Sequence, residues 1–68
     1  MTTLTLTSPD ISCDHCRRTI EGELGAVPGV DRVAVAVAER QVTVAYDEDQ
    51  VDPAAVRARL AAIGYPPD

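Results

Sequence analysis

The sequence predicts an α+β fold in which two helices cover one face of an antiparallel sheet. Three stretches alternate apolar side chains with polar or small ones, as strands do, and two others repeat apolar residues with the spacing of a helix. The 68 residues contain no Trp or Phe and only two Tyr. We therefore expect a single domain, residues 1–68, with an aliphatic core and its chemistry at the surface.

The first two elements are a strand and a helix, with Cys13 in the loop between them and Cys16 in the helix. Residues 2–7 alternate Thr and Leu, which predicts a half-buried strand with Leu4 and Leu6 facing inward. Residues 8–10 end this strand, because Ser, Pro and Asp favour turns. A helix is expected over about residues 14–24. Its apolar stripe consists of Cys16, Ile20, Leu24 and Val27.

A hairpin is expected in the middle of the chain. Residues 25–29 turn the chain, because they contain two Gly and one Pro. Residues 30–37 then predict a second strand and residues 42–46 a third, joined by a tight connection at residues 39–41. The side chains that alternate along these two strands are Val33, Val35, Val37, Val42, Val44 and Tyr46.

A second helix follows the acidic residues 47–49, which we expect to form a solvated turn. Asp52 is a typical N-cap, Pro53 a typical first helical residue, and Gly64 a typical stop. The buried side of this helix is marked by Val56, Leu60 and Ile63.

The order of these elements is the split β-α-β pattern of a ferredoxin-like sandwich. The full pattern ends with a fourth strand, for which only residues 65–68 remain. Two of these residues are Pro, which cannot donate to a ladder. We therefore expect a β-α-β-β-α-(β) fold in which the fourth strand is short or missing.

The charge pattern excludes several kinds of partner. Six Arg stand against 11 acidic residues, a net charge of −5, whereas nucleic acids and anionic membranes attract basic surfaces. No apolar run is long enough for membrane insertion, and residues 1–7 lack the charged start and apolar core of a signal peptide. We therefore expect a soluble cytoplasmic protein whose thiols stay reduced.

Cys13 and Cys16 are the residues best suited to carry the chemistry. Their Cys-x-x-Cys spacing, at a junction of loop and helix, lets both sulfurs converge on one point. The positive end of the helix, together with Arg17 and Arg18, favours thiolates, which are ligands for soft metals such as Cu(I). Two sulfurs are fewer than the four ligands of a structural zinc site. We therefore expect an exposed site that passes Cu(I) to an incoming thiolate.

Two other functions fit the same residues. Asp10 and Asp14 offer hard oxygen ligands, which favours a site for Zn(II) or another divalent ion. Cys-x-x-Cys also occurs in thiol-disulfide oxidoreductases, although so short a chain has little room for a substrate groove.

The chain resembles the heavy-metal-associated domain family, and within it the bacterial CopZ-type copper chaperones. The family motif Gly-Met-x-Cys-x-x-Cys corresponds to Asp-Ile-Ser-Cys-Asp-His-Cys at residues 10–16. The resemblance covers nearly the whole chain. Its other matching stretches are Pro28-Gly29-Val30, Val42-Thr43-Val44 with Tyr46-Asp47, and Ile63-Gly64-Tyr65.

The resemblance implies a metal carrier and not an enzyme. Cys13 and Cys16 would bind Cu(I) and deliver it to the metal-binding domain of a copper-transporting P-type ATPase. Met1 and the compact length favour a free protein over a domain excised from a transporter. We expect a monomer, or a dimer bridged by the metal.

Five residues near the cysteines have alternative roles. His15 is either an exposed surface residue or a third ligand. Tyr65 either caps the core or closes over the site and donates its hydroxyl to a thiolate. Ile11 stands where the family has Met, and we expect it to anchor the loop. Asp10 and Asp14 are expected to be a loop residue and an N-cap, or accessory ligands.

Overall fold

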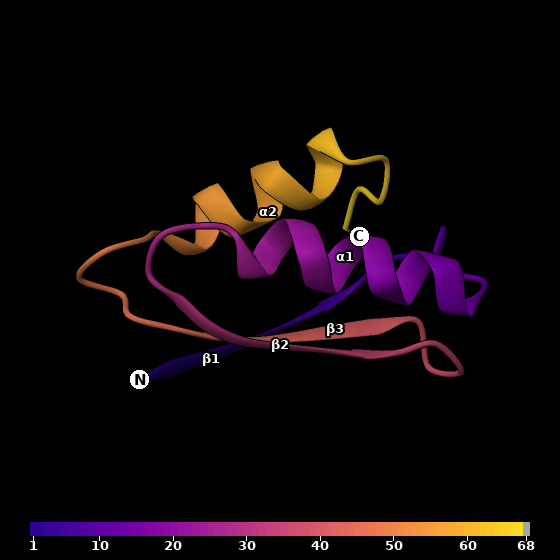
Figure 1. Ribbon diagram of the computed structural model, residues 1–68, viewed down its shortest axis with the longest axis horizontal. Coiled ribbons are helices and arrows are strands. Elements are labelled where there is room, and N and C mark those ends of the chain that lie inside the picture. Colours follow the sequence, from indigo (N-terminus) through magenta and orange to yellow (C-terminus); the bar gives the residue numbers. More distant parts are fainter. Residues whose placement is uncertain (68) are drawn as a thin grey trace.

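The computed structural model describes residues 1–67, whose five elements follow the predicted order. They are β1 (Thr2–Thr7), α1 (Asp14–Gly25), β2 (Val30–Ala36), β3 (Gln41–Tyr46) and α2 (Pro53–Ala62). The strands form an antiparallel sheet in the order β1-β3-β2, and both helices lie on one side of it (Figure 1). The predicted sandwich is confirmed. In the described part of the chain, neither helix is long and apolar enough to cross a membrane.

One hydrophobic core fills the space between the sheet and the helices. Residues that alternate along the strands, and residues three or four apart on the helices, point toward it. The half-buried side chains of Val33, Val35 and Val37 close its edge at β2. Its buried members are Leu6, Ile11, Cys16, Ile20, Leu24, Val42, Val44, Tyr46, Val51, Val56 and Leu60.

The connection between β2 and β3 differs from the predicted one. Val37 belongs to a turn over residues 37–40, which is closed by a 3.1 Å hydrogen bond from the Arg40 N–H to the Val37 carbonyl. Arg40 takes a positive φ of 56° to complete this turn. Gln41, expected in the connection, lies in β3 because the strand pairing continues through it on both sides.

The two helices begin in different ways. Asp52 has the extended backbone of an N-cap and Pro53 is the first residue of α2, as predicted, although the Asp52 side chain makes no capping hydrogen bond. At α1 the N-cap is Cys13, with φ −155° and ψ 171°. The predicted capping role of Asp14 is therefore wrong, because Asp14 is already the first helical residue.

The end of the chain returns toward α1 without forming a strand in residues 65–67 (Figure 1). Gly64 reverses the direction with a φ of +97°, and the Tyr65 N–H then donates to the Leu60 carbonyl at 3.0 Å. Pro66 and Pro67 have no N–H to continue a ladder. Asp68, the last residue of the expected short fourth strand, lies outside the described residues.

Candidate metal centre

The two cysteines lie at the end of the molecule where the loop after β1 enters α1. Cys16 belongs to the inward stripe of α1 and is only 7% exposed, so core packing holds its side chain. Cys13 precedes the helix and stays exposed to solvent. Both thiols are free, and their sulfurs are 3.4 Å apart. The site therefore combines one fixed sulfur with one that another molecule can reach.

The loop that carries Cys13 is anchored to the core. Ile11 is fully buried, and its N–H donates to the Ser8 carbonyl at 3.3 Å. At the other side of the cysteine, the Arg17 N–H donates to the Cys13 carbonyl at 3.3 Å and begins the helical hydrogen bonding. Because the backbone is hydrogen-bonded on both sides of Cys13, the fold sets the position of the two cysteines relative to each other.

Hydrogen bonding lowers the pKa of Cys16 to about 6. The largest contribution comes from the Tyr65 hydroxyl, followed by the Ser12 backbone and the Cys13 side chain, while partial burial acts in the opposite direction. The same contact with Cys16 raises the pKa of Tyr65. A thiolate is therefore favoured at neutral pH. The contribution of Ser12 was not predicted, because it comes from a backbone group and the residue type gives no signal for it.

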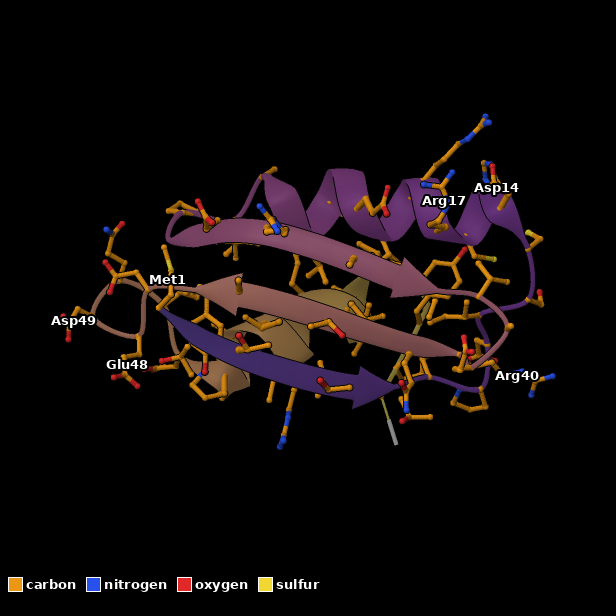
Figure 2. The ribbon with its side chains drawn as sticks, turned by 90° about the horizontal axis from the view of Figure 1, so that it is seen from below. Met1, Asp14, Arg17, Arg40, Glu48 and Asp49 are labelled. Atoms are coloured by element: carbon orange, nitrogen blue, oxygen red, sulfur yellow. The ribbon has the colours of Figure 1, made fainter. Side chains whose placement is uncertain are left out.

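Arg17 and Arg18 pair with acidic side chains of α1, and neither is among the main causes of the lowered pKa of Cys16. Their guanidinium Nε atoms lie 2.7 and 3.0 Å from the two carboxylate oxygens of Asp14, and Arg17 also lies 3.0 Å from Glu21 (Figure 2). Hydrogen bonding from Arg17 is the largest cause of the lowered pKa of Asp14. The arginine charges are therefore compensated on the surface of α1, and both Asp14 oxygens are occupied.

The two other candidate ligands, His15 and Asp10, do not form a group of three or more ligands with the sulfurs in the described residues. His15 and Asp10 are exposed, and the charge of Asp10 contributes to the raised pKa of Tyr65. Within residues 1–67, no three or more His, Cys, Asp or Glu side chains are placed to hold a metal ion, and no cleft is present. The described chain thus offers a two-sulfur site.

The acidic turn at residues 47–49 is remote from the cysteines. Figure 2 shows Glu48 and Asp49 near Met1, at the opposite end from Asp14 and Arg17. The Asp47 carboxylate accepts hydrogen bonds from the Asp49 N–H and the Gln50 side chain, at 3.0 and 3.1 Å. These contacts describe a solvated turn, as predicted.

The pKa of Cys16 gives a pH-dependent signal that Tyr65→Phe should change. Because the hydroxyl of Tyr65 favours the thiolate, its removal is expected to move the pKa from about 6 upward, toward the ordinary range of a thiol. The native chain should lose this thiolate as the pH falls through 6, and the variant should lose it at higher pH. The ultraviolet absorbance of thiolates, titrated without oxygen, measures both midpoints.

The variant Cys16→Ser is the control for this titration, because it should remove the component with its midpoint near pH 6. Equal midpoints in the native chain and in Tyr65→Phe would show that the hydroxyl does not support the thiolate.

Comparison with known proteins identifies the class to which this fold and cysteine pair belong. Residues 5–66 match the model of the heavy-metal-associated domain. The chain belongs to this family, and the resemblance based on the cysteine motif is confirmed.

The relatives include carriers and transporters of different metals. A zinc-transporting ATPase of Synechocystis sp. is 40% identical over 81% of this chain, and the copper chaperone CopZ of Staphylococcus haemolyticus is 36% identical over 81% of both chains. Among solved structures, a CopZ metallochaperone superposes with a TM-score of 0.94 and 27% identity, covering 98% of this chain and 100% of that one. The chain spans less than a tenth of the length of the transporter relatives it matches.

Proposed function

We propose that this protein is a metallochaperone that binds Cu(I) through Cys13 and Cys16. It transfers the ion by thiolate exchange to the metal-binding domain of a copper-transporting P-type ATPase. The observation that carries this proposal is the pair of sulfurs 3.4 Å apart, one exposed and one buried. The protein acts as a single domain, residues 1–68, in the cytoplasm, and it makes or breaks no substrate bond. It is a monomer until a shared metal bridges two copies.

The proposed transfer follows from the unequal exposure of the sulfurs. An acceptor thiolate approaches from solvent on the Cys13 side and forms a bond to Cu(I) while both original bonds remain. Cys13 then leaves, a second acceptor sulfur enters, and Cys16 leaves last because the core restrains it. Cu(I) accepts low coordination and soft ligands, so the ion is never released into water.

The choice of Cu(I) is supported by the ligand set. Thiolates are soft ligands, and the lowered pKa of Cys16, about 6, makes one available at neutral pH. The carboxylate of Asp14 is held by Arg17 and Arg18, so binding a metal there would break two ion pairs. These features favour a soft, two-coordinate ion over a divalent ion that needs oxygen ligands.

A competition titration tests this proposal. The reduced chain is titrated with Cu(I) and with Zn(II) in the absence of oxygen, each against a chelator of known affinity. We expect one Cu(I) per chain, bound more tightly than Zn(II) by at least roughly three orders of magnitude, because thiolates prefer the softer ion. Comparable affinities for the two ions would contradict the choice of copper. Incubation of the loaded chain with a metal-binding domain of a copper-transporting ATPase should then divide the copper between the two proteins.

Zinc is the second candidate, and its basis is the match to a zinc-transporting ATPase. In that case Asp10, whose charge contributes to the raised pKa of Tyr65, would join the sulfurs as an oxygen ligand. Asp10→Asn would then weaken Zn(II) binding and leave Cu(I) binding unchanged, with Asp14→Asn as the matched control. Under the copper proposal, neither substitution changes the Cu(I) affinity.

A further inference from the structure

Ser8 is the one polar side chain that is fully buried among residues 1–67. A hydroxyl removed from water destabilises the fold unless it finds a hydrogen-bond partner. The Ser8 Oγ donates to the carbonyl oxygen of Pro66 at 3.3 Å, and no buried side-chain polar atom of the described chain is left without a partner. The bond joins residues 58 positions apart in the sequence.

The backbone of Ser8 ties two further segments together at the metal end of the molecule. Its N–H donates to the Arg40 carbonyl at 2.9 Å, and its carbonyl accepts from the Ile11 N–H at 3.3 Å. Ser8 therefore contacts the hairpin turn at residues 37–40, the loop that carries Cys13, and the end of the chain. Figure 2 shows Arg40 at the same end of the molecule as Asp14 and Arg17.

The partner of the Ser8 hydroxyl lies directly after Tyr65. The Tyr65 side chain is half-buried and packs against the core that includes Cys16. Within residues 1–67, the bond to Ser8 is the one hydrogen bond that joins Pro66 or Pro67 to the rest of the fold. The ring of Pro66 fixes its φ and limits the backbone conformations of the preceding residue, Tyr65. A bond that holds the Pro66 carbonyl therefore also limits the movement of Tyr65.

We propose that Ser8 is a positioning residue of the metal site, whose buried hydroxyl holds Pro66 and thereby keeps the Tyr65 ring beside the cysteine pair. The proposal rests on the metal-binding function proposed for that pair. In place of a paired fourth strand, two hydrogen bonds hold residues 65–67: the Tyr65 N–H bonds to the Leu60 carbonyl before the ring, and the Ser8 hydroxyl bonds to the Pro66 carbonyl after it. Tyr65 then limits access to the bound ion, and loss of the Ser8 bond lets the tail move away.

A double-mutant cycle tests this role through the rate at which a small chelator removes Cu(I). Ser8→Ala is expected to raise that rate about fivefold, the effect of one lost neutral hydrogen bond. Tyr65→Ala should raise it at least as much. In the Tyr65→Ala background, Ser8→Ala should add nothing, because the ring that it positions is gone. Independent, multiplicative effects of the two substitutions would overturn the proposal.

A second measurement needs no metal and separates this proposal from the copper function. In the nuclear magnetic resonance spectrum of the reduced, metal-free chain, Ser8→Ala should weaken the contacts between the Tyr65 ring and the core. Thr7→Ala is the matched control, since it removes an exposed hydroxyl one residue away and should leave these contacts intact. Unchanged Tyr65 contacts in Ser8→Ala would refute the positioning role even if copper binds as proposed.

Pro66→Gly covers the case in which Ser8→Ala folds poorly. Pro66 is exposed, so its replacement spares the core and keeps the carbonyl that accepts from Ser8. It removes the ring that fixes φ, and with it the rigid link from that carbonyl to Tyr65. The variant should reproduce both the faster loss of Cu(I) and the weaker Tyr65 contacts, and native behaviour in both measurements would also count against the proposal.

Discussion

Replacing Cys13 and Cys16 together by Ser is expected to lower the Cu(I) affinity of this protein by on the order of ten thousandfold, since a hydroxyl is a poor ligand for a soft ion. The exposed and the buried sulfur converge to 3.4 Å, the sequence contains no further Cys, and no group of three or more His, Cys, Asp or Glu side chains is placed to hold a metal ion among residues 1–67. The double variant therefore has no thiolate left to bind the ion. Competition with a Cu(I) chelator under anaerobic conditions measures the loss.

The single variants show how the two sulfurs divide the binding. Cys13→Ser changes an exposed position and should leave the midpoint temperature of unfolding nearly unchanged. Cys16→Ser places a hydroxyl at a buried position and should lower that midpoint temperature. His15→Ala is the matched control for both, because His15 is exposed and its loss should leave the Cu(I) affinity within about twofold of the native value. Native affinity in the double variant would disprove the copper proposal, and a large effect at His15 would reveal a third ligand.

Gly29→Ala is expected to destabilise the fold by about 2–4 kcal/mol, from a strained backbone and from overpacking. Gly29 has a φ of +93°, and a Cβ built there would lie 2.8 Å from the Gln50 Cβ and 3.1 Å from a Val51 methyl group. The Gly29 carbonyl also accepts the Asp47 N–H at 2.8 Å, so the backbone cannot shift freely. In a domain of this size the thermal midpoint should fall by roughly 10–25 °C.

Two other glycines provide controls that separate strain from overpacking. Gly64 has a φ of +97° with no atom within 4 Å of a built Cβ, so Gly64→Ala should cost only about 1 kcal/mol from the backbone. Gly22 lies inside α1, also with open space around it, and Gly22→Ala should stabilise the protein by about 0.5–1 kcal/mol. Equal midpoints for the variants at Gly29 and Gly64 would show that the contact with residues 50 and 51 does not matter. Thermal unfolding followed by circular dichroism decides between these outcomes.

The elements of this fold are encoded in local patterns. The alternation of Thr and Leu at residues 2–7, the apolar stripe from Cys16 to Leu24, and Asp52 followed by Pro53 each fix one element through its own side chains. Such patterns depend on the periods of strand and helix, so they can be recognised without tertiary contacts. The turn lies at residues 37–40 and not at the predicted residues 39–41, because its position depends on how far β3 remains paired with both neighbours.

The cysteine motif was also visible in the sequence, but its electrostatics were not. Residue types suggested that Arg17 and Arg18 support the thiolates. In the structure Asp14 binds both guanidinium groups, and the pKa of Cys16 is lowered instead by Tyr65, 49 residues further along the chain. An arginine can form an ion pair with a carboxylate one helical turn away or act on the cysteines at the start of the helix. Sequence spacing alone does not show which of these partners its flexible side chain contacts.

The order of the elements, the aliphatic core and the pair of cysteines can all be inferred from the amino-acid sequence, because each depends on residue type and local spacing. The groups that surround those cysteines are known from the folded structure alone. The fold packs Tyr65 against the core that includes Cys16, buries the Ser8 hydroxyl against Pro66, and leaves Cys13 open to solvent. These contacts join segments that are distant in the chain. They follow from the packing of the helices on the sheet, which no local pattern contains.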